Sequence, residues 1–457
     1  MKNYKVWGWF GAAALGVILA GCGSGSSSNA NVRLANATLT HASLDLLINS
    51  SSSVTGVAAD TISNYASPSS GSETLQVNDS TSSTALATTV PTLASGLHYA
   101  LVAYESGGAV QTVVLSEDFV APTSGTAQLR VYNVAPDSGK LDVYITPHST
   151  PVMPLTGLTP TYSFTTNITT PLLTYSPTSY DVQVTGYGNQ SDVRAIITNV
   201  TLTNQEIATV LLTPASGGKL LNGSVVIQQG AYSAERNTYT RVRLASAVAG
   251  GVLVGANAVP TNPNSTTPPQ STVVIDPGSV SPQFGLYTLV PAASTLNINV
   301  ANGSVQAPSN GLIAGADMTL VVFGGGTAPG GGVAPVSANL ITDDNRLPTD
   351  STTVKLNVIN GLTSTGGGTV TLNANSTPVG GSVALGAASS YVSIPSSTVA
   401  TNIKVFSSLH GLLINDSTNL LNANAVYTIL VGGDYLVYAA NPSANPSALQ
   451  LVLQSQQ

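Results

Sequence analysis

Short stretches in which apolar and polar residues alternate recur along most of the chain. Clear examples lie at 141–145, 181–184 and 296–300. A period of two places the apolar side chains on one face of a strand, so these stretches predict half-buried β-strands. Turn-forming residues cluster between the strands, as at 136–139 and 366–368. We find no apolar periodicity that would form an amphipathic helix of three turns, and the sequence therefore predicts an all-β fold.

Two sequence markers recur at nearly constant spacing. The first is a short β pattern whose last residue is Asn36, Asn133, Ser246 or Asn360, which gives spacings of 97, 113 and 114 residues. The second begins with a leucine, at Leu93, Leu202, Leu312 and Leu421, which gives spacings of 109, 110 and 109 residues. Two independent markers with one period predict four tandem repeats of about 110 residues.

Each predicted repeat has the size and pattern of an immunoglobulin-like β-sandwich, because its strands are short and its turns are frequent. The predicted repeats are 31–124, 125–236, 237–346 and 347–457. Beyond residue 21 the chain has no Trp and no pair of Cys residues. This excludes true antibody-type domains but not the sandwich architecture.

The opening of the second repeat resembles a known bacterial family. Residues 129–137 read Leu-Arg-Val-Tyr-Asn-Val-Ala-Pro-Asp, and residues 141–144 read Leu-Asp-Val-Tyr. Together they resemble the start of the bacterial domain of unknown function 4397. Residues 117–122 and 343–348 look like the linkers that lead into such domains. The resemblance implies a β fold in a secreted or lipidated bacterial protein, and the family carries no assigned activity.

The resemblance varies among the four repeats. It is clearest in the second repeat and fair in the first and fourth. The third repeat lacks the Asp-Val-Tyr counterpart and carries a Pro/Asn/Thr-rich insertion near 260–277. The fourth repeat has Asn357 where the others have Arg.

Residues 1–21 have the pattern of a bacterial export signal. Lys2 and Lys5 precede an apolar run that ends in Leu-Ala-Gly-Cys at 19–22. The run is shorter than the roughly 20 residues that span a bilayer. Its last four residues resemble the lipobox of bacterial lipoproteins, in which the Cys thiol takes a diacylglyceryl group and becomes the mature N-terminus. We therefore predict cleavage after residue 21 and lipidation of Cys22; the alternative is a plain signal peptide with a chance Cys.

The residues after the lipobox predict where in the cell the protein is located. Residues 22–30 contain a Gly/Ser-rich run that behaves as a flexible tether. Several acyl chains on one residue form a stable membrane anchor, since each buried CH₂ contributes about 0.8 kcal/mol. In lipoproteins of Gram-negative bacteria, Asp after the Cys tends to retain the protein at the inner membrane. Position 23 is Gly, so the resemblance implies the outer membrane of the cell envelope.

Composition removes several classes of function. Only 7% of the 457 residues are charged, against about 25% in typical soluble proteins. Hydrophobic residues make up 42% of the chain, enough to bury a core, so disorder is not expected. The net charge is −7, and removal of Lys2 and Lys5 with the signal takes it to −9. Such an acidic chain has no footprint for nucleic acid. The single Cys excludes a disulfide framework.

Three further patterns do not match catalytic or metal sites. The four histidines, His41, His98, His148 and His410, do not share metal-ligand spacing. Ser-Gly-Gly-Lys at 216–219 matches the Ser-x-x-Lys of some acyltransferases, but it lies between strand patterns and predicts a turn. The glycine-rich run 324–332 has no Lys for phosphate binding and predicts a hairpin or linker. We predict no catalytic residues, no cofactor and no metal site.

Two groups of charged residues leave alternatives open. Asp343, Asp344, Asn345 and Asp350 could bind calcium between repeats, with 117–118 as a counterpart, or could form a polar linker. A second group consists of Arg33, Arg130 and Arg243, which recur at one strand position. They could contact an anion or glycan, but pairs with an acid of the same repeat, such as Asp45 or Asp142, are favoured. Tyr99 and Tyr427 occupy a position that suits the core.

The sequence therefore predicts a non-enzymatic, lipid-anchored envelope protein. Its repeats are expected to lie in series and to act as a surface spacer or as an adhesion or binding array, with a protein or glycan ligand left open. A periplasm-facing factor that holds partners by strand addition to exposed edges is a second interpretation. A lipoprotein hydrolase is a third and would need a pair of acids at a cleft.

Overall fold

A computed structural model of the protein describes residues 29–455 except 166–167, 218, 262–270, 302, 327–331, 363–367, 410 and 434–448, and it describes only the backbone of 449–455. The predicted signal peptide, Cys22 and His410 lie outside the described residues. β-Strands are the dominant secondary structure of the described residues, and the one helical element among them is the 3₁₀ turn η1 (Pro136–Ser138). Within the described ranges, no helix has the length and apolar character needed to span a bilayer. The predicted all-β class is confirmed.

The strands of the first and second repeats form two main sheets in each repeat. In the first, the sheet orders are β10-β9-β1-β4 and β3-β2-β6-β7, with β5 and β8 paired separately. In the second, the orders are β14-β11-β17-β18-β19 and β13-β12-β15-β16. The bounds of the strands are β1 Asn31–Asn36, β2 Ser43–Ile48, β3 Ser51–Ala58, β4 Thr61–Ile62, β5 Gly71–Ser72, β6 Leu75–Asp79, β7 Ala85–Thr89, β8 Thr92–Leu93, β9 His98–Ser106, β10 Ala109–Ser116, β11 Ala127–Asn133, β12 Leu141–Pro147, β13 Tyr162–Phe164, β14 Leu173–Tyr175, β15 Ser179–Gly186, β16 Asn189–Thr201, β17 Ile207–Pro214, β18 Leu221–Ile227 and β19 Tyr232–Glu235.

The third and fourth repeats also form two main sheets each. They differ in that the second sheet of the third repeat has three described strands instead of four. The third repeat has the sheets β23-β20-β27-β28-β26, where β24 also pairs with β20, and β22-β21-β25. The fourth has β32-β29-β35-β36 and β31-β30-β33-β34. The bounds are β20 Tyr239–Val248, β21 Leu253–Pro260, β22 Val273–Val280, β23 Gln283–Phe284, β24 Thr288–Pro291, β25 Ser294–Val300, β26 Val305–Gln306, β27 Asp317–Gly324, β28 Val336–Asp343, β29 Thr353–Leu362, β30 Val370–Ala374, β31 Thr377–Val383, β32 Val392–Pro395, β33 Thr401–Ser407, β34 Gly411–Asn419, β35 Ala425–Gly433 and β36 Leu449–Ser455.

The two sequence markers of each repeat lie side by side in space. The strand of the first marker pairs in parallel with the strand that follows the second marker, in the pairs β1–β9, β11–β17, β20–β27 and β29–β35. In the first and fourth repeats, the asparagine that ends the first marker joins the two sheets of its repeat. The side-chain amide of Asn36 donates to the carbonyl of Val57 at 3.1 Å, and that of Asn360 donates to Val383 at 3.0 Å. Both asparagines are fully buried, so these bonds replace the hydrogen bonds lost from water.

The second marker contains a bond typical of immunoglobulin-type sandwiches. The hydroxyl of Tyr99 accepts a hydrogen bond from the backbone of Ala94 at 3.0 Å, and Tyr427 accepts one from Asn422 at 3.2 Å. A tyrosine that bonds the backbone a few residues upstream is the tyrosine corner of this fold class. Tyr427 is buried in its repeat, and Tyr99 packs against its core. The immunoglobulin-like sandwich is thus confirmed by local geometry as well as by the separate sheets.

Each repeat has its own hydrophobic core between its two sheets. Two further apolar clusters lie between repeats. In one, Ala100 and Val102 of the first repeat pack against Leu211 of the second; in the other, Ala247 of the third packs against Leu430 of the fourth. One sheet of each repeat is therefore covered on both faces. This explains why every residue of β17 and of β27 is buried and why their sequences do not alternate.

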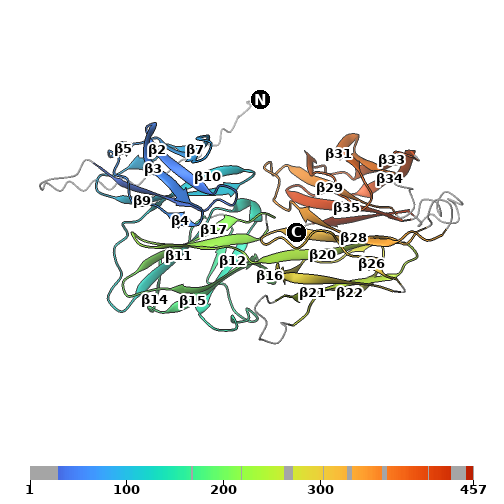
Figure 1. Cartoon of the computed structure of the whole chain (residues 1–457), viewed down its shortest axis with the longest axis horizontal. Coiled ribbons are helices and arrows are strands. Elements are labelled where there is room, and N and C mark those ends of the chain that lie inside the picture. The colour runs from blue at the N-terminus through green and yellow to red at the C-terminus, as the bar shows by residue number, and fades with distance from the viewer. Residues whose placement is uncertain are drawn as a thin grey trace, which may run out of the picture.

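The four repeats form a two-by-two block rather than a string. Figure 1 shows the first repeat above the second on one side and the fourth above the third on the other. The first and second repeats pack face to face, as do the third and fourth. The expectation of repeats extended in series therefore differs from the structure, because apolar sheet faces favour lateral packing over an extended chain.

Candidate functional site

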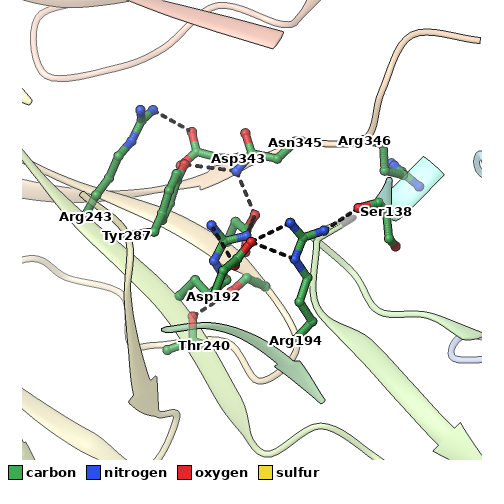
Figure 2. Close-up of polar contacts among 12 residues, drawn as sticks. Ser138, Asp192, Arg194, Thr240, Arg243, Tyr287, Asp343, Asn345 and Arg346 are labelled. Carbon is green, nitrogen blue, oxygen red and sulfur yellow. Dashed lines mark hydrogen bonds and ion pairs between the residues drawn. The ribbon is translucent and has the colours of Figure 1, made fainter. Parts of the chain in front are cut away.

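Charged side chains gather where the repeats meet, in a chain that has few of them. Arg194, Arg241, Arg243, Asp317 and Asp343 are all buried, and they come from the second and third repeats. Figure 2 shows Arg194, Arg243 and Asp343 among them. Buried charges are expensive unless they are paired and hydrogen-bonded. Their gathering in one place identifies the junction as the site with the most specific chemistry in the described chain.

Asp192 forms the ion pair that connects the second repeat to the third, and Asp317 contacts the arginine of that pair within the third repeat. Asp192 accepts hydrogen bonds from Arg194 at 3.1 and 2.5 Å, and its other oxygen lies 3.8 Å from the guanidinium of Arg241. Arg241 also contacts Asp317 at 3.4 Å. Asn345 donates its amide to Asp317 at 2.7 Å. Burial raises the pKa of Asp317, and Arg241 and Asn345 oppose that shift.

Asp343 is the centre of a second cluster. It accepts hydrogen bonds from Thr319 at 2.6 Å, Tyr287 at 2.7 Å and Tyr391 of the fourth repeat at 3.3 Å. Arg243 lies 3.8 Å from the same carboxylate, and its guanidinium stands 4.8 Å from the centre of the Tyr287 ring. The cluster therefore ties the third repeat to the fourth.

The first repeat contains a similar group of an arginine, a tyrosine and an acid. Arg33 bonds both oxygens of Glu117, and Tyr65 donates its hydroxyl to the same carboxylate at 2.7 Å. Arg33 also donates to the carbonyls of Gly230 at 2.6 Å and Ile227 at 3.0 Å, which belong to the second repeat. The Arg–Tyr–acid group of an odd-numbered repeat thus lies beside the repeat that follows it.

The recurrent arginines have other partners than the example acids, Asp45 and Asp142. Asp45 accepts from the backbone of Gly56 at 2.7 Å, and Asp142 accepts from Gly188 at 2.8 Å, so both acids serve turns in the opposite sheet. The predicted pairing with an acid of the same repeat is confirmed for Arg33 with Glu117 and for Arg243 with Asp343. Asp45 and Asp142 were the wrong examples, because they lie on the other sheet of the sandwich. Arg130 donates to Thr209 at 2.9 Å and stacks on Phe119 at 4.5 Å, and no ion pair joins it within the described ranges.

The Ser-x-x-Lys stretch also lies at the junction. Residues 216–217 form a turn between β17 and β18, as predicted, and not the helix that the acyltransferase motif requires. The backbone of Gly217 donates to Gly315 at 3.1 Å and accepts from Asn345 at 3.2 Å. Lys219 is buried beside two arginines and two acids. Burial, together with Arg194 and Arg241, lowers the pKa of Lys219 to about 8.

A cavity of about 600 Å³ lies beside this junction. Its wall combines Ser106 and Gly107 of the first repeat, Pro136 and Asp137 of the second, the linker 344–349 and Lys355, Ser393 and Asn424 of the fourth. One carboxylate oxygen of Asp137 is buried without a hydrogen-bond partner among the described residues. Burial raises the pKa of Asp137, and Arg346 opposes the shift.

A small charge network lines the cavity beside Asp137. Asp344 accepts from Arg346 at 2.8 Å and lies 2.7 Å from the ammonium of Lys355. Burial raises the pKa of Asp344, but the hydrogen bonds from Arg346 and Lys355 outweigh it and hold that pKa below its usual value. Lys355 also stands 4.9 Å from the ring of Tyr391. The cavity lining therefore combines the carboxylate of Asp137 with two cations that Asp344 holds.

The residues considered for calcium binding do not share one centre. Asp343, Asp344 and Glu117 face arginines or lysines, and Asp350 caps its own turn through Thr352 at 2.7 Å. Among the described residues, no group of three or more His, Cys, Asp or Glu side chains could hold a metal ion. In the structure these acids serve as partners of basic side chains or of their own turn.

The three described histidines each contact an aspartate. His41 lies 2.9 Å from Asp79, His98 lies 3.1 Å from Asp118, and His148 lies 2.7 Å from Asp181. The three pairs lie in different parts of the first two repeats. They link neighbouring strands and loops, and they do not converge on one site.

Residues 30–144 match the model of the family described as domain of unknown function 4397, so the resemblance predicted from the motifs is confirmed for this part of the chain. The matched range spans the first repeat and the opening of the second. A solved structure titled "The Bacillus anthracis TIE protein" is similar at 10% identity and a TM-score of 0.14, over 89% of this chain and 68% of that one. No curated protein matches the chain.

Proposed function

We propose that the protein is a lipid-anchored, non-enzymatic component of the bacterial cell envelope, whose four repeats form a rigid block that binds a ligand. The observation that carries the anchor is the lipobox pattern at 19–22, which ends in the only Cys of the chain. The Gly/Ser-rich run after Cys22 would form a flexible linker between the membrane and the first repeat.

The packing of the repeats favours a binding block over a spacer. A spacer gains reach from units that lie end to end, whereas here apolar faces join the repeats in pairs. An ion pair between Asp192 and Arg241, together with backbone hydrogen bonds of Gly217, then connects the second repeat with the third. A block that is held in this way presents its loops and cavity in a fixed geometry, which limits the entropy lost on binding.

The cavity between the repeats is the proposed ligand site. The carboxylate of Asp137 supplies an acceptor to its lining, and Arg346 and Lys355 supply donors beside the apolar surface of Leu347. Hydroxyl groups both donate and accept hydrogen bonds. The lining therefore suits a polyhydroxylated ligand such as a short glycan. Asp137 is the proposed acceptor for the hydroxyl groups of that ligand.

Membrane fractionation tests the anchor. Wild-type protein is expected in the outer-membrane fraction, and Cys22→Ser is expected in the soluble periplasmic or secreted fraction. A Gly23→Asp variant is a matched control that keeps the Cys, and it is expected to move to the inner membrane. Wild-type protein that stays soluble, or Cys22→Ser that stays in the membrane, would overturn the anchor.

Protease added to intact cells separates the adhesion role from the periplasmic one. An antibody to residues of the fourth repeat reports on the block, and a known periplasmic protein controls for leakage. Loss of signal with an intact control supports an outward-facing binding block. Protection until the outer membrane is opened would support the periplasmic partner-binding role instead.

Calorimetric titration with a panel of soluble glycans tests the cavity. Asp137→Ala is expected to weaken binding at least about tenfold, because a hydrogen bond to a charged group contributes roughly 1.5–3 kcal/mol. Asp416→Ala is the matched control, since Asp416 lies in the fourth repeat outside the cavity and bonds only its own turn. Equal binding by both variants would remove the cavity as the site. Hydrolysis of the same glycans would favour the hydrolase interpretation.

A further inference from the structure

Among the described residues, the second sheet of the third repeat lacks a strand that the other repeats have. In the other repeats, the strands β6, β15 and β33 pair on both sides, because β7, β16 and β34 form a fourth strand. In the third repeat, the equivalent strand β25 pairs with β21, and the described sheet ends there. The chain after β25 joins the other sheet instead, as β26 beside β28.

We propose that β25 of one molecule pairs with β25 of a second copy, in an antiparallel two-fold dimer. The pairing would join the two three-stranded sheets into one continuous sheet. It would give β25 the neighbour that β6, β15 and β33 find within their own repeats. This proposal rests on the open edge alone and is independent of the lipid anchor.

The hydrogen-bonding groups of β25 point in the direction that the dimer needs. Thr261 donates to Ala293, and Ala301 donates to Leu253, just outside the two ends of the β21–β25 ladder. In an antiparallel ladder, residues whose groups face the partner strand alternate with residues whose groups face away. The odd-numbered residues of β25 therefore bond β21. The backbone groups of Leu296 and Ile298 face the open edge.

The sequence of β25 is complementary to itself in one register. Antiparallel pairing centred on Asn297 sets Leu296 opposite Ile298 of the second copy, and the reverse. Both residues present open backbone groups, so the two strands can exchange hydrogen bonds. Side chains of paired residues lie on the same face of a sheet. The apolar residues of both copies would thus continue one core face, and Thr295, Asn297 and Asn299 would stay on the solvent face.

The side chains of β25 show that this core is incompletely covered. Leu296, Ile298 and Val300 are only half-buried and pack at the margin of the third core. The equivalent residues of the first, second and fourth repeats are fully buried, for example Val77, Val184 and Val405. A neighbouring strand with its own apolar residues on this face would cover the margin.

The edge also lacks the features that keep sheet edges apart. Proteins protect edges with charges, prolines or bulges. Residues 294–300 contain no charged residue and no proline, and β25 pairs with β21 without a register shift. The opposite edge strand, β22, has Pro277 and two register shifts. Because no charge lies between 292 and 306, two acidic molecules can meet at this edge without direct repulsion, which favours a second copy of this chain as the occupant.

Sedimentation velocity of the full chain carrying Cys22→Ser, over a range of concentrations, tests the dimer. The unmodified edge is expected to give a concentration-dependent dimer. Asn297 is exposed, and the two-fold axis places it opposite itself, so Asn297→Lys and Asn297→Asp each bring like charges together. Each variant is expected to weaken the dimer at least about tenfold, and an equal mixture of the two is expected to restore it.

The control places the same charge on a different edge strand. Gln111 is exposed on β10, which ends a sheet of the first repeat, and Gln111→Lys is expected to leave the dimer unchanged. A monomer at all concentrations would overturn the proposal. So would a dimer that neither Asn297 variant weakens, or one that the mixture fails to restore. A monomer that takes up a synthetic β-strand peptide would assign the edge to another partner.

Discussion

Tyr287 donates a hydrogen bond to the buried carboxylate of Asp343 at 2.7 Å. The same hydroxyl accepts the amide of Asn345 at 3.0 Å, so one side chain connects the third repeat to the linker that leads into the fourth. Tyr65 and Glu117 show the same bond at 2.7 Å in the first repeat. This recurrence shows that the chain is organised as two pairs of repeats, and that each pair uses a similar polar group at its junction.

Tyr287→Phe is expected to lower the free energy of unfolding by about 1–3 kcal/mol, because Asp343 and Asn345 each lose a hydrogen-bond partner in a buried site. Urea unfolding measures the change. Tyr187→Phe is the matched control, since Tyr187 is 55% exposed, and it is expected to be nearly neutral. Equal effects of the two changes would contradict the assigned role of the hydroxyl.

Arg33 and Arg130 occupy the same strand position but differ in their partners. Arg33→Met would leave Glu117 buried without its cation, at a cost of about 3–5 kcal/mol. Arg130→Met would break one hydrogen bond to Thr209 and leave no acid behind, at a cost of about 1 kcal/mol. Guanidinium unfolding of both variants checks this order. A larger loss for Arg130→Met would show that the Arg33 pair does not stabilise the first junction.

Gly217→Ala is expected to loosen the contact between the second and third repeats. An added Cβ would stand 2.2 Å from the backbone nitrogen of Asp317, closer than any real contact, so the junction must shift. We expect a loss of about 1–3 kcal/mol and faster limited proteolysis between β19 and β20. Gly311→Ala, where a Cβ would meet nothing within 4 Å, is the control. Unchanged proteolysis of Gly217→Ala would mean that the two repeats are not held together there.

Lys219 predicts a dependence of stability on alkaline pH. Its pKa is about 8 in the folded protein against 10.5 in the unfolded chain. Between these values the unfolded chain binds more protons, so stability rises with pH through this window. Below pH 8 both states are protonated, and the cost of the buried charge is fully present.

Comparison with a variant isolates this effect. From pH 7.5 to 10.5, the wild-type protein is expected to gain about 3 kcal/mol relative to Lys219→Met. The exposed Lys140→Met is the control, measured over the same range. A difference between wild type and Lys219→Met that does not change with pH would refute the assigned environment of Lys219.

The sequence predicted the sandwiches well because two of their features are local. Alternation marks the strands, and the markers at Asn36 and Leu93 recur because each serves a contact within its own repeat. The lateral packing was not predicted. Its signal lies in continuous apolar runs such as 210–212 and 320–323, which are typical of strands that are buried on both faces.

The junction and the cavity were beyond sequence reasoning for a different reason. Asp137, Asp192 and Lys355 lie in three different segments, and only the packing of the repeats brings their neighbourhoods together. The sequence marks Asp343 and Arg243 separately as candidate residues, but their contact depends on the register of β20, β27 and β28. The low content of charged residues is the one sequence feature that points to the junction. In a chain with so few charges, those that are present are expected to have specific structural roles.

The mass of the N-terminal peptide, from protein extracted from bacterial membranes, tests the proposed anchoring most directly. The expected peptide begins at Cys22 and carries the added mass of a diacylglyceryl group, with or without a further acyl chain. A peptide that begins before residue 22, or one that begins at or after it without an attached lipid, would contradict lipid anchoring.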